Sequence, residues 1–150
     1  MSKSAKLVSL SVLVTLLFLT AYGFYGRSVV NPRVLAELQT NPQGERAAIA
    51  MQITLPDGKQ LPVNYLREGN IVYMGVDGFW WRQLLSNDAP VSLLIKGQVF
   101  TGRASVVLDD PEYTRANFRR LRPKVPEWLP DWLNGKLVVI HLDASVELSR

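Results

Sequence analysis

Few side chains in this sequence could carry out chemistry by themselves. His141 is the only histidine; in a strand it would alternate with apolar neighbours and could serve as a general base. A lone histidine without a second ligand in view is also typical of a structural residue. The chain has no cysteine, which excludes a thiolate nucleophile, a disulfide and a thiolate metal ligand. No serine–histidine–acid set, phosphate-binding loop, dinucleotide-binding glycine pattern or zinc spacing is present. We therefore name no catalytic residue from the sequence.

An acidic cluster lies just before an expected helix. Asp109, Asp110 and Glu112 are residue types that could hold a metal ion. An aspartate cap, the proline at position 111 and an acidic first turn explain the same residues as the start of a helix. The sequence therefore predicts no metal site.

Two adjacent tryptophans, Trp80 and Trp81, lie in residues 79–86, which are expected to form one or two helical turns. Because adjacent positions of a helix point in different directions, we expect one indole to be buried and the other to line a pocket or meet lipid. Arg82 beside them could contact an anionic ligand, and a solvated surface role is the alternative. The apolar side of these turns is expected to comprise Phe79, Trp80, Gln83 and Leu84.

These residues must be positioned by a run of short strands between residues 47 and 107. Turn sequences separate the strands at Pro56–Lys59, Glu68–Asn70 and Lys96–Gly97, each with a glycine that tolerates a left-handed backbone. Short strands at this spacing favour a mainly β fold, here a small antiparallel barrel with short helices. The expected strands are 48–55, 60–67, 71–76, 91–95, 98–108 and 136–143, and the expected helices are 32–40, 79–86 and 111–121.

The N-terminal part of the chain differs sharply in composition from the rest. After a basic leader, residues 1–6, residues 7–26 carry no charge. As a helix these residues would reach about 30 Å, the thickness of the hydrocarbon core of a bilayer. Aromatic residues at positions 22, 24 and 25 fit the membrane interface. We expect a retained single-pass transmembrane helix; a cleaved signal peptide, with a small-residue site at 21–23, is the alternative.

Basic residues flank the apolar segment on both sides. Lys3 and Lys6 precede it, and Arg27 and Arg33 follow it. The positive-inside rule weakly favours an N-terminus on the cytoplasmic side and a main domain on the other side, and the side stays open. Residues 27–46 are expected to form a helical stalk or linker, and residues 47–150 the barrel domain.

The pattern resembles the deazaflavin-dependent nitroreductase family of the FMN-binding split β-barrel superfamily, over roughly residues 32–142. The resemblance rests on 59–62 with Asn64 and Tyr65, on 75–78 with residues 80–84 and Asn87, and on 110–112 with the closing strand. It implies a split barrel and a bound deazaflavin or FMN. Superfamily members include dimers with shared sites as well as monomers, so a homodimer stays open. The cofactor-binding residues implied by the resemblance are Lys59, Pro62, Asn64, Gly75, Val76, Trp81 and Arg82.

One departure from the family pattern concerns the cofactor phosphate. The family usually has a longer Gly-Arg-x-Ser-Gly loop between the first two strands, and here that loop is the turn Pro56–Lys59. A phosphate needs several converging N–H groups or basic side chains, and a tight hairpin with one lysine offers few. The fold likeness is therefore better supported than the cofactor.

Two functions follow from these patterns. The first is a membrane-anchored split-barrel oxidoreductase that uses deazaflavin or flavin to reduce a lipophilic acceptor such as a quinone. The alternative is a barrel without a cofactor, tethered to the lipid bilayer as a binding or assembly module. A third reading is an interfacial lipid-binding protein, with Trp128 and Trp132 exposed at the membrane interface. The resemblance equally implies that this segment covers the substrate pocket, and a core role for one of the two tryptophans stays open. The net charge is +4, of which Lys3 and Lys6 contribute two, so no nucleic-acid partner is expected.

Overall fold

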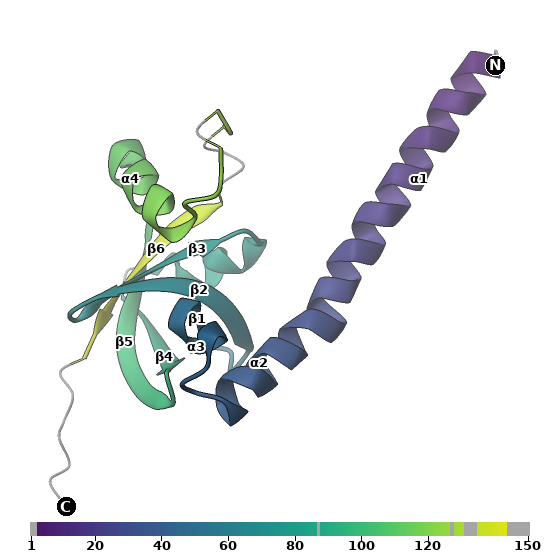
Figure 1. The fold of residues 1–150 in the computed structure, drawn as a ribbon. Helices are drawn as coiled ribbons and strands as arrows, with labels where there is room; N and C mark the ends of the chain where they lie inside the picture. The colour runs from purple at the N-terminus through teal and green to yellow at the C-terminus, as the bar shows by residue number, and fades with distance from the viewer. Residues whose placement is uncertain (1–2, 87, 127, 131–134, 144–150) are drawn as a thin grey trace, which may run out of the picture.

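The computed structural model describes residues 3–86, 88–126, 128–130 and 135–143. A long N-terminal helix leads into a small β-barrel, and α4 lies across the outside of the barrel (Figure 1). The helical elements are α1 (Lys3–Tyr25), η1 (Gly26–Val30), α2 (Asn31–Thr40), α3 (Glu45–Ile49), η2 (Phe79–Leu84) and α4 (Pro111–Leu121). The strands are β1 (Ala50–Thr54), β2 (Gln60–Glu68), β3 (Ile71–Val76), β4 (Ala89–Ile95), β5 (Gln98–Val107) and β6 (Lys136–Leu142).

Six antiparallel strands close into a barrel in the order β1-β2-β3-β6-β5-β4, which confirms the predicted fold class. Hairpin turns make β1, β2 and β3 neighbours and pair β4 with β5. The last strand inserts between β3 and β5, where Val138 pairs with Met74 and Ile140 pairs with Ala104. Pairing of Gln52, Ile53 and Thr54 of β1 with β4 closes the barrel.

Side chains of alternate strand residues fill the barrel. Val72, Met74 and Val76 of β3 point inward, as do Val138 and Ile140 of β6, and all five are fully buried. Outward-facing residues in the middle of the same two strands are also buried, because α4 covers them. This second cluster comprises Tyr73, Phe118, Leu137 and Val139. Both faces of β3 and β6 therefore carry apolar residues, a pattern that period-two alternation alone would not produce.

α4 begins as predicted from its sequence. The carboxylate of Asp110 accepts a hydrogen bond from the backbone N–H of Tyr113 (2.9 Å), and Pro111 occupies the first helical turn. The helix ends with two ion pairs to the barrel: Arg120 pairs with Glu68 of β2, and Arg122 pairs with Asp77 after β3. These contacts fix both the position and the direction of α4.

The N-terminal helix runs without a break from α1 through η1 into α2. Asn31 begins α2 as expected, but the expected short separate helix is instead the continuation of the apolar one. Proline has no N–H to donate within a helix. One π-helical turn precedes Pro32, and in it the N–H of Asn31 donates to the carbonyl of Gly26. By length and composition, Val8–Thr40 contains a segment able to cross a membrane, and no residue of that segment is buried.

The first strand begins later than expected. Residues 48 and 49, predicted as strand, belong to the short helix α3. The reason is a small apolar contact in which Ala47 and Ala50 pack against Leu38 of α2, with Val34 at its edge. This contact also attaches the end of the long helix to the barrel.

Gly135→Ala should destabilise the barrel more than Gly58→Ala. Their φ angles are +78° and +82°, so alanine at either position is forced into a left-handed backbone at a cost of about 1–2 kcal/mol. A Cβ at Gly135 would also press on the carbonyl of Val76 and lie 2.9 Å from an Asp77 carboxylate oxygen, whereas Gly58 has nothing within 4 Å. Urea unfolding of the full-length chain in detergent, followed by tryptophan fluorescence, measures the difference. Equal losses at the two positions would contradict the close packing of Gly135.

Candidate functional site

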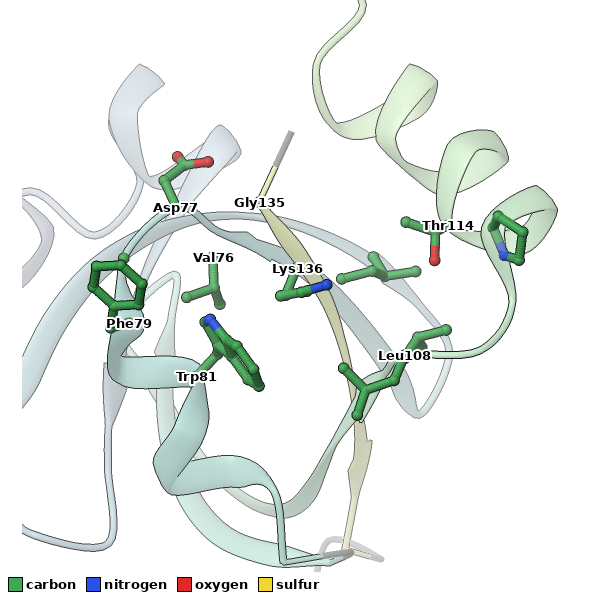
Figure 2. Close-up of a pocket in the computed structure, with 12 residues that line it drawn as sticks. Val76, Asp77, Phe79, Trp81, Leu108, Thr114, Gly135 and Lys136 are labelled. Carbon is green, nitrogen blue, oxygen red and sulfur yellow. The ribbon is translucent and has the colours of Figure 1, made fainter. Parts of the chain in front are cut away.

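Two clefts meet at the C-terminal end of β3, and Asp77 and Gly78 line both of them. The η2–α4 cleft has a volume of about 470 Å³ and lies between η2, the end of β5, the start of α4 and the start of β6. Figure 2 shows Trp81 and Leu108 on opposite sides of this cleft, with Lys136 between them. Its walls are mostly apolar and include Val76, Phe79, Trp81, Leu108, Lys136 and Leu137.

The α2–barrel cleft, of about 380 Å³, lies on the other side of Asp77. It is bounded by the first residue of α2, by β2 and β3, and by the end of α4. Its lining is more polar than that of the η2–α4 cleft. The residues that give it this character are Asn31, Asn64, Asp77 and Arg122.

Each tryptophan of η2 lines a different cleft. Both indoles are half-buried and pack against the barrel core, so the expectation that only one would be buried is wrong. Trp80 faces the α2–barrel cleft and Trp81 faces the η2–α4 cleft. This arrangement lets two separate sites share one short element.

The expected apolar side of η2 is also wrong. Phe79 is 76% exposed and Gln83 is exposed, while Leu84 is fully buried. η2 is a 3₁₀ helix, in which residues three apart lie above one another. Leu84 therefore shares a side with Trp81, and Arg82 lies over the ring of Phe79, 5.1 Å from its centroid.

Two cations flank the indole of Trp81. The guanidinium carbon of Arg82 and the ammonium nitrogen of Lys136 each lie 5.8 Å from the centre of the ring. Distances below about 6 Å are within the range of cation–π attraction. The η2–α4 cleft thus combines a flat aromatic wall with positive charge from two different elements. Such a site suits an aromatic ligand that carries negative charge.

The Asp77–Arg122 ion pair separates the two clefts. One guanidinium nitrogen of Arg122 donates to both carboxylate oxygens of Asp77, at 2.8 Å each. The guanidinium also lies over the ring of Phe118, 5.2 Å from its centroid. Together they occupy the space above Gly75, where a Cβ would come within 2.6 Å of Phe118 and 3.0 Å of Arg122. Gly75 therefore permits the close approach of α4 to β3.

The predicted cofactor residues do not form one site. Pro62, Asn64 and Gly75 line the α2–barrel cleft, while Val76 and Trp81 line the η2–α4 cleft. Arg82 lies beside the η2–α4 cleft through its contacts with Phe79 and Trp81. Lys59 is exposed at the tip of its hairpin and lines neither cleft.

The remaining residues singled out in the sequence are placed as follows. The backbone N–H of Lys59 donates to the Asp57 carboxylate (3.0 Å), a hydrogen bond within the turn that stabilises the hairpin. His141 is exposed on β6, where it pairs with Ile71 and Arg103. In the part of the chain that the structure describes, no three histidine, aspartate or glutamate side chains gather to hold a metal ion. Asn87 and Trp132 lie outside the described residues.

Lys136 and Arg122 are the site residues that sequence patterns missed. In the sequence, Lys136 is only the first residue of an expected strand, and Arg122 is one of several basic residues close together. Neither pattern indicates a role in a site. Their roles depend on partners 55 and 45 positions away in the chain, Trp81 and Asp77. Only the placement of β6 beside β3 and of α4 across it brings these pairs together.

A pair of tyrosines joins the first turn of α4 to β3. The rings of Tyr113 and Tyr73 meet edge to face, with centroids 6.4 Å apart. Hydrogen bonding with Tyr73, assisted by burial, raises the pKa of Tyr113 to about 12. The neutral phenol is therefore the form that the fold stabilises.

The chain matches no known family profile and no curated protein sequence. Solved structures with a similar fold include a candidate pyridoxamine 5'-phosphate oxidase from Listeria innocua, at 16% identity and a TM-score of 0.48, covering 75% of this chain and 90% of that one. An F420 reductase has 14% identity and a TM-score of 0.43 over 64% and 87% of the two chains. A candidate 5-nitroimidazole antibiotic resistance protein from Bacteroides thetaiotaomicron has 18% identity and a TM-score of 0.44 over 75% and 80%. At these values neither activity, ligand nor family membership follows from the likeness.

The contact between Tyr113 and the barrel should weaken at high pH. A raised pKa means that the neutral form contributes stability fully below the ordinary value of 10, and that this contribution is lost as the pH rises from 10 to about 12. An absorbance titration of phenolate formation, with circular dichroism recorded in parallel, should show a late transition of Tyr113 accompanied by loosening of α4; burial also raises the pKa of Tyr65, so the Tyr113 transition is identified by difference from a variant. Tyr113→Phe should lack that transition. A Tyr113 that ionises together with the exposed tyrosines would contradict the hydrogen bond to Tyr73.

Proposed function

We propose that the chain is a membrane-anchored oxidoreductase whose barrel holds a flavin or deazaflavin in the η2–α4 cleft. The observation that supports this function is the apolar cleft walled by Trp81 and flanked by Arg82 and Lys136. Its volume of about 470 Å³ lies within the range of about 300–1,000 Å³ usual for small-molecule sites. When bound, the cofactor would supply hydride transfer, and the chain would supply binding, orientation and charge.

The residues of the cleft fit the ring end of such a cofactor. Val76, Leu108 and Leu137 provide an apolar slot, and the indole of Trp81 provides a flat surface for stacking. The phosphate end requires cations, and Lys59 lines neither cleft. We therefore place the anionic end of the cofactor at Lys136 and Arg82, which departs from the site implied by the family resemblance.

The proposed acceptor is a lipophilic molecule such as a quinone. The apolar helix α1 can anchor the barrel at a bilayer by its length and composition. An anchored barrel would draw its acceptor from the lipid phase instead of from water. The side of the membrane on which the barrel lies follows in this proposal from the positive-inside rule, which weakly favours the non-cytoplasmic side.

A second candidate function is a membrane-tethered binding or assembly module without a cofactor. The observation that favours it is the tight hairpin at Pro56–Lys59, where the N–H of Lys59 is already engaged by Asp57 and the N–H of Gly58 donates to the carbonyl of Leu55. These backbone donors are unavailable to a phosphate. Direct measurement of cofactor binding distinguishes the two functions.

Trp81→Ala and Lys136→Gln should each weaken binding of FMN or deazaflavin by about tenfold or more, because a stacking surface or a charge-assisted contact worth about 1.5–3 kcal/mol is lost. The measurement is a titration of the full-length chain in detergent, followed by cofactor fluorescence. Lys59→Gln is the charge-matched control and should leave the affinity unchanged.

Two results would contradict this proposal. Absence of saturable binding by the folded chain would exclude the oxidoreductase and leave the tethered module. Weakening by Lys59→Gln but not by Lys136→Gln would place the phosphate at the hairpin and contradict its assignment to the η2–α4 cleft.

A further inference from the structure

The α2–barrel cleft is lined by uncharged hydrogen-bonding groups that the fold itself does not use. Asn31, the first residue of α2, and Asn64 of β2 each bring a carboxamide to the cleft. Trp80 brings an indole N–H: a Cβ at Gly78 would come within 3.5 Å of the indole nitrogen. In the part of the chain that the structure describes, neither carboxamide nor this N–H takes part in a hydrogen bond. These groups are therefore available to a ligand.

The lining of this cleft has no net charge. Its charged members are Asp77 and Arg122, and one guanidinium nitrogen of Arg122 donates to both carboxylate oxygens of Asp77, at 2.8 Å each. An ionic ligand would be attracted to one member of this pair and repelled by the other. The cleft therefore favours an uncharged ligand. In this respect it differs from the η2–α4 cleft, where two cations flank Trp81.

The mixture of donors and acceptors indicates which uncharged ligand fits. A carboxamide both donates and accepts, an indole N–H only donates, and a carboxylate only accepts. A hydroxyl group answers all three because it donates and accepts at a single oxygen, whereas a carbonyl group can only accept. A ligand with several hydroxyls can therefore use the whole set.

The same cleft also offers apolar surface beside its polar groups. Pro62 and Val63 of β2 and Leu121 of α4 line it, together with the half-buried ring of Trp80. Aromatic and aliphatic surface suits the C–H faces of a ring. The volume of about 380 Å³ lies within the range usual for small-molecule sites. A sugar ring combines C–H faces with hydroxyl edges and carries no charge.

The position of Asn31 on the long helix indicates where such a ring would come from. Gly26, where the apolar segment ends, lies five residues before Asn31, or about 7.5 Å at about 1.5 Å per residue. The headgroup region of each leaflet is about 5–7.5 Å thick, half the difference between the whole bilayer and its hydrocarbon core. If α1, which continues beyond the barrel (Figure 1), crosses a bilayer, the cleft faces the headgroups of the nearest leaflet.

We propose that the α2–barrel cleft binds the sugar head group of an uncharged glycolipid, with hydrogen bonds from Asn31, Asn64 and Trp80. This inference goes beyond the oxidoreductase proposal and takes from it only the membrane span. The bound head group would connect the anchoring helix to β2 and η2. It would leave the η2–α4 cleft free for a cofactor.

Native mass spectrometry of the full-length chain, released from lipid nanodiscs, can test this site. The nanodiscs would contain phosphatidylcholine with monoglucosyl diacylglycerol, with diacylglycerol that lacks the sugar, or with phosphatidylglycerol. We expect one glucosyl lipid to be retained, several-fold more often than either of the other two lipids. Equal retention of phosphatidylglycerol would overturn the proposal, because the cleft would then not select an uncharged sugar.

Substitutions in the cleft should reduce this retention. Asn64→Leu and Asn31→Leu keep the size of the side chain and should each weaken binding by about fivefold, the factor expected for one neutral hydrogen bond. Trp80→Phe keeps an aromatic ring without the N–H and should act in the same direction. Asn70→Leu is the matched control, because Asn70 is exposed in the β2–β3 turn and lines neither cleft. Thermal unfolding followed by circular dichroism checks that each variant is folded.

The remaining outcomes separate the source of the sugar from the site itself. Methyl glucoside, titrated into the chain in a detergent without a sugar head group, tests for a free sugar. Binding of methyl glucoside without retention of the glycolipid would overturn the lipid source and assign the cleft to a soluble sugar. Binding of neither probe, or equal losses in Asn64→Leu and Asn70→Leu, would overturn the site. No flavin or deazaflavin is present in these measurements, so their failure is distinguishable from failure of the oxidoreductase proposal.

Discussion

The close approach of α4 to the end of β3 is the contact on which the rest of the structure depends. It requires a glycine at position 75, because Phe118 and Arg122 fill the space that a side chain there would take. The ion pair between Arg122 and Asp77 joins the end of α4 to the chain after β3, and its partly exposed groups contribute modestly to stability. From this point α4 covers the outer face of β3 and β6, the chain returns to insert β6, and two clefts form on either side of Asp77.

Local patterns predicted most of the barrel. Turn residues at Pro56–Lys59 and Lys96–Gly97 fixed hairpins whose geometry depends on a few neighbouring residues, and the cap at Asp110 predicted the start of α4 in the same way. The order of strands needed more, because the place of β6 depends on a crossing by α4. The face of η2 was wrong for a different reason: a short segment can be a 3₁₀ helix, whose three-residue period exposes Phe79 instead of burying it.

The candidate site was harder to predict than the fold. A family resemblance placed Lys59 with Trp81 and Gly75 in one site. In the structure, Trp81 lines the η2–α4 cleft, Gly75 lines the α2–barrel cleft on the other side of Asp77, and Lys59 lines neither. The cations nearest Trp81 come from the adjacent Arg82 and from Lys136 on a strand far along the chain. Periodicity describes the faces of one element at a time. A site built from β3, η2 and β6 therefore becomes visible only when the pairing of the strands is known.

In the proposed membrane-anchored arrangement, the unbroken helix from α1 to α2 would make the barrel follow the tilt of α1. From Gly26 to Thr40 the helix extends about 21 Å beyond the apolar segment, at about 1.5 Å per residue. Transmembrane helices tilt by about 20° on average, and more when the bilayer is thinner than their apolar length. A change of about 20° would move the end of α2 sideways by about 7 Å relative to the lipid surface. Bilayer thickness would then change the position of the barrel relative to the lipid surface. The π-turn at Gly26–Val30 is the one irregular turn of the helix between Lys3 and Thr40.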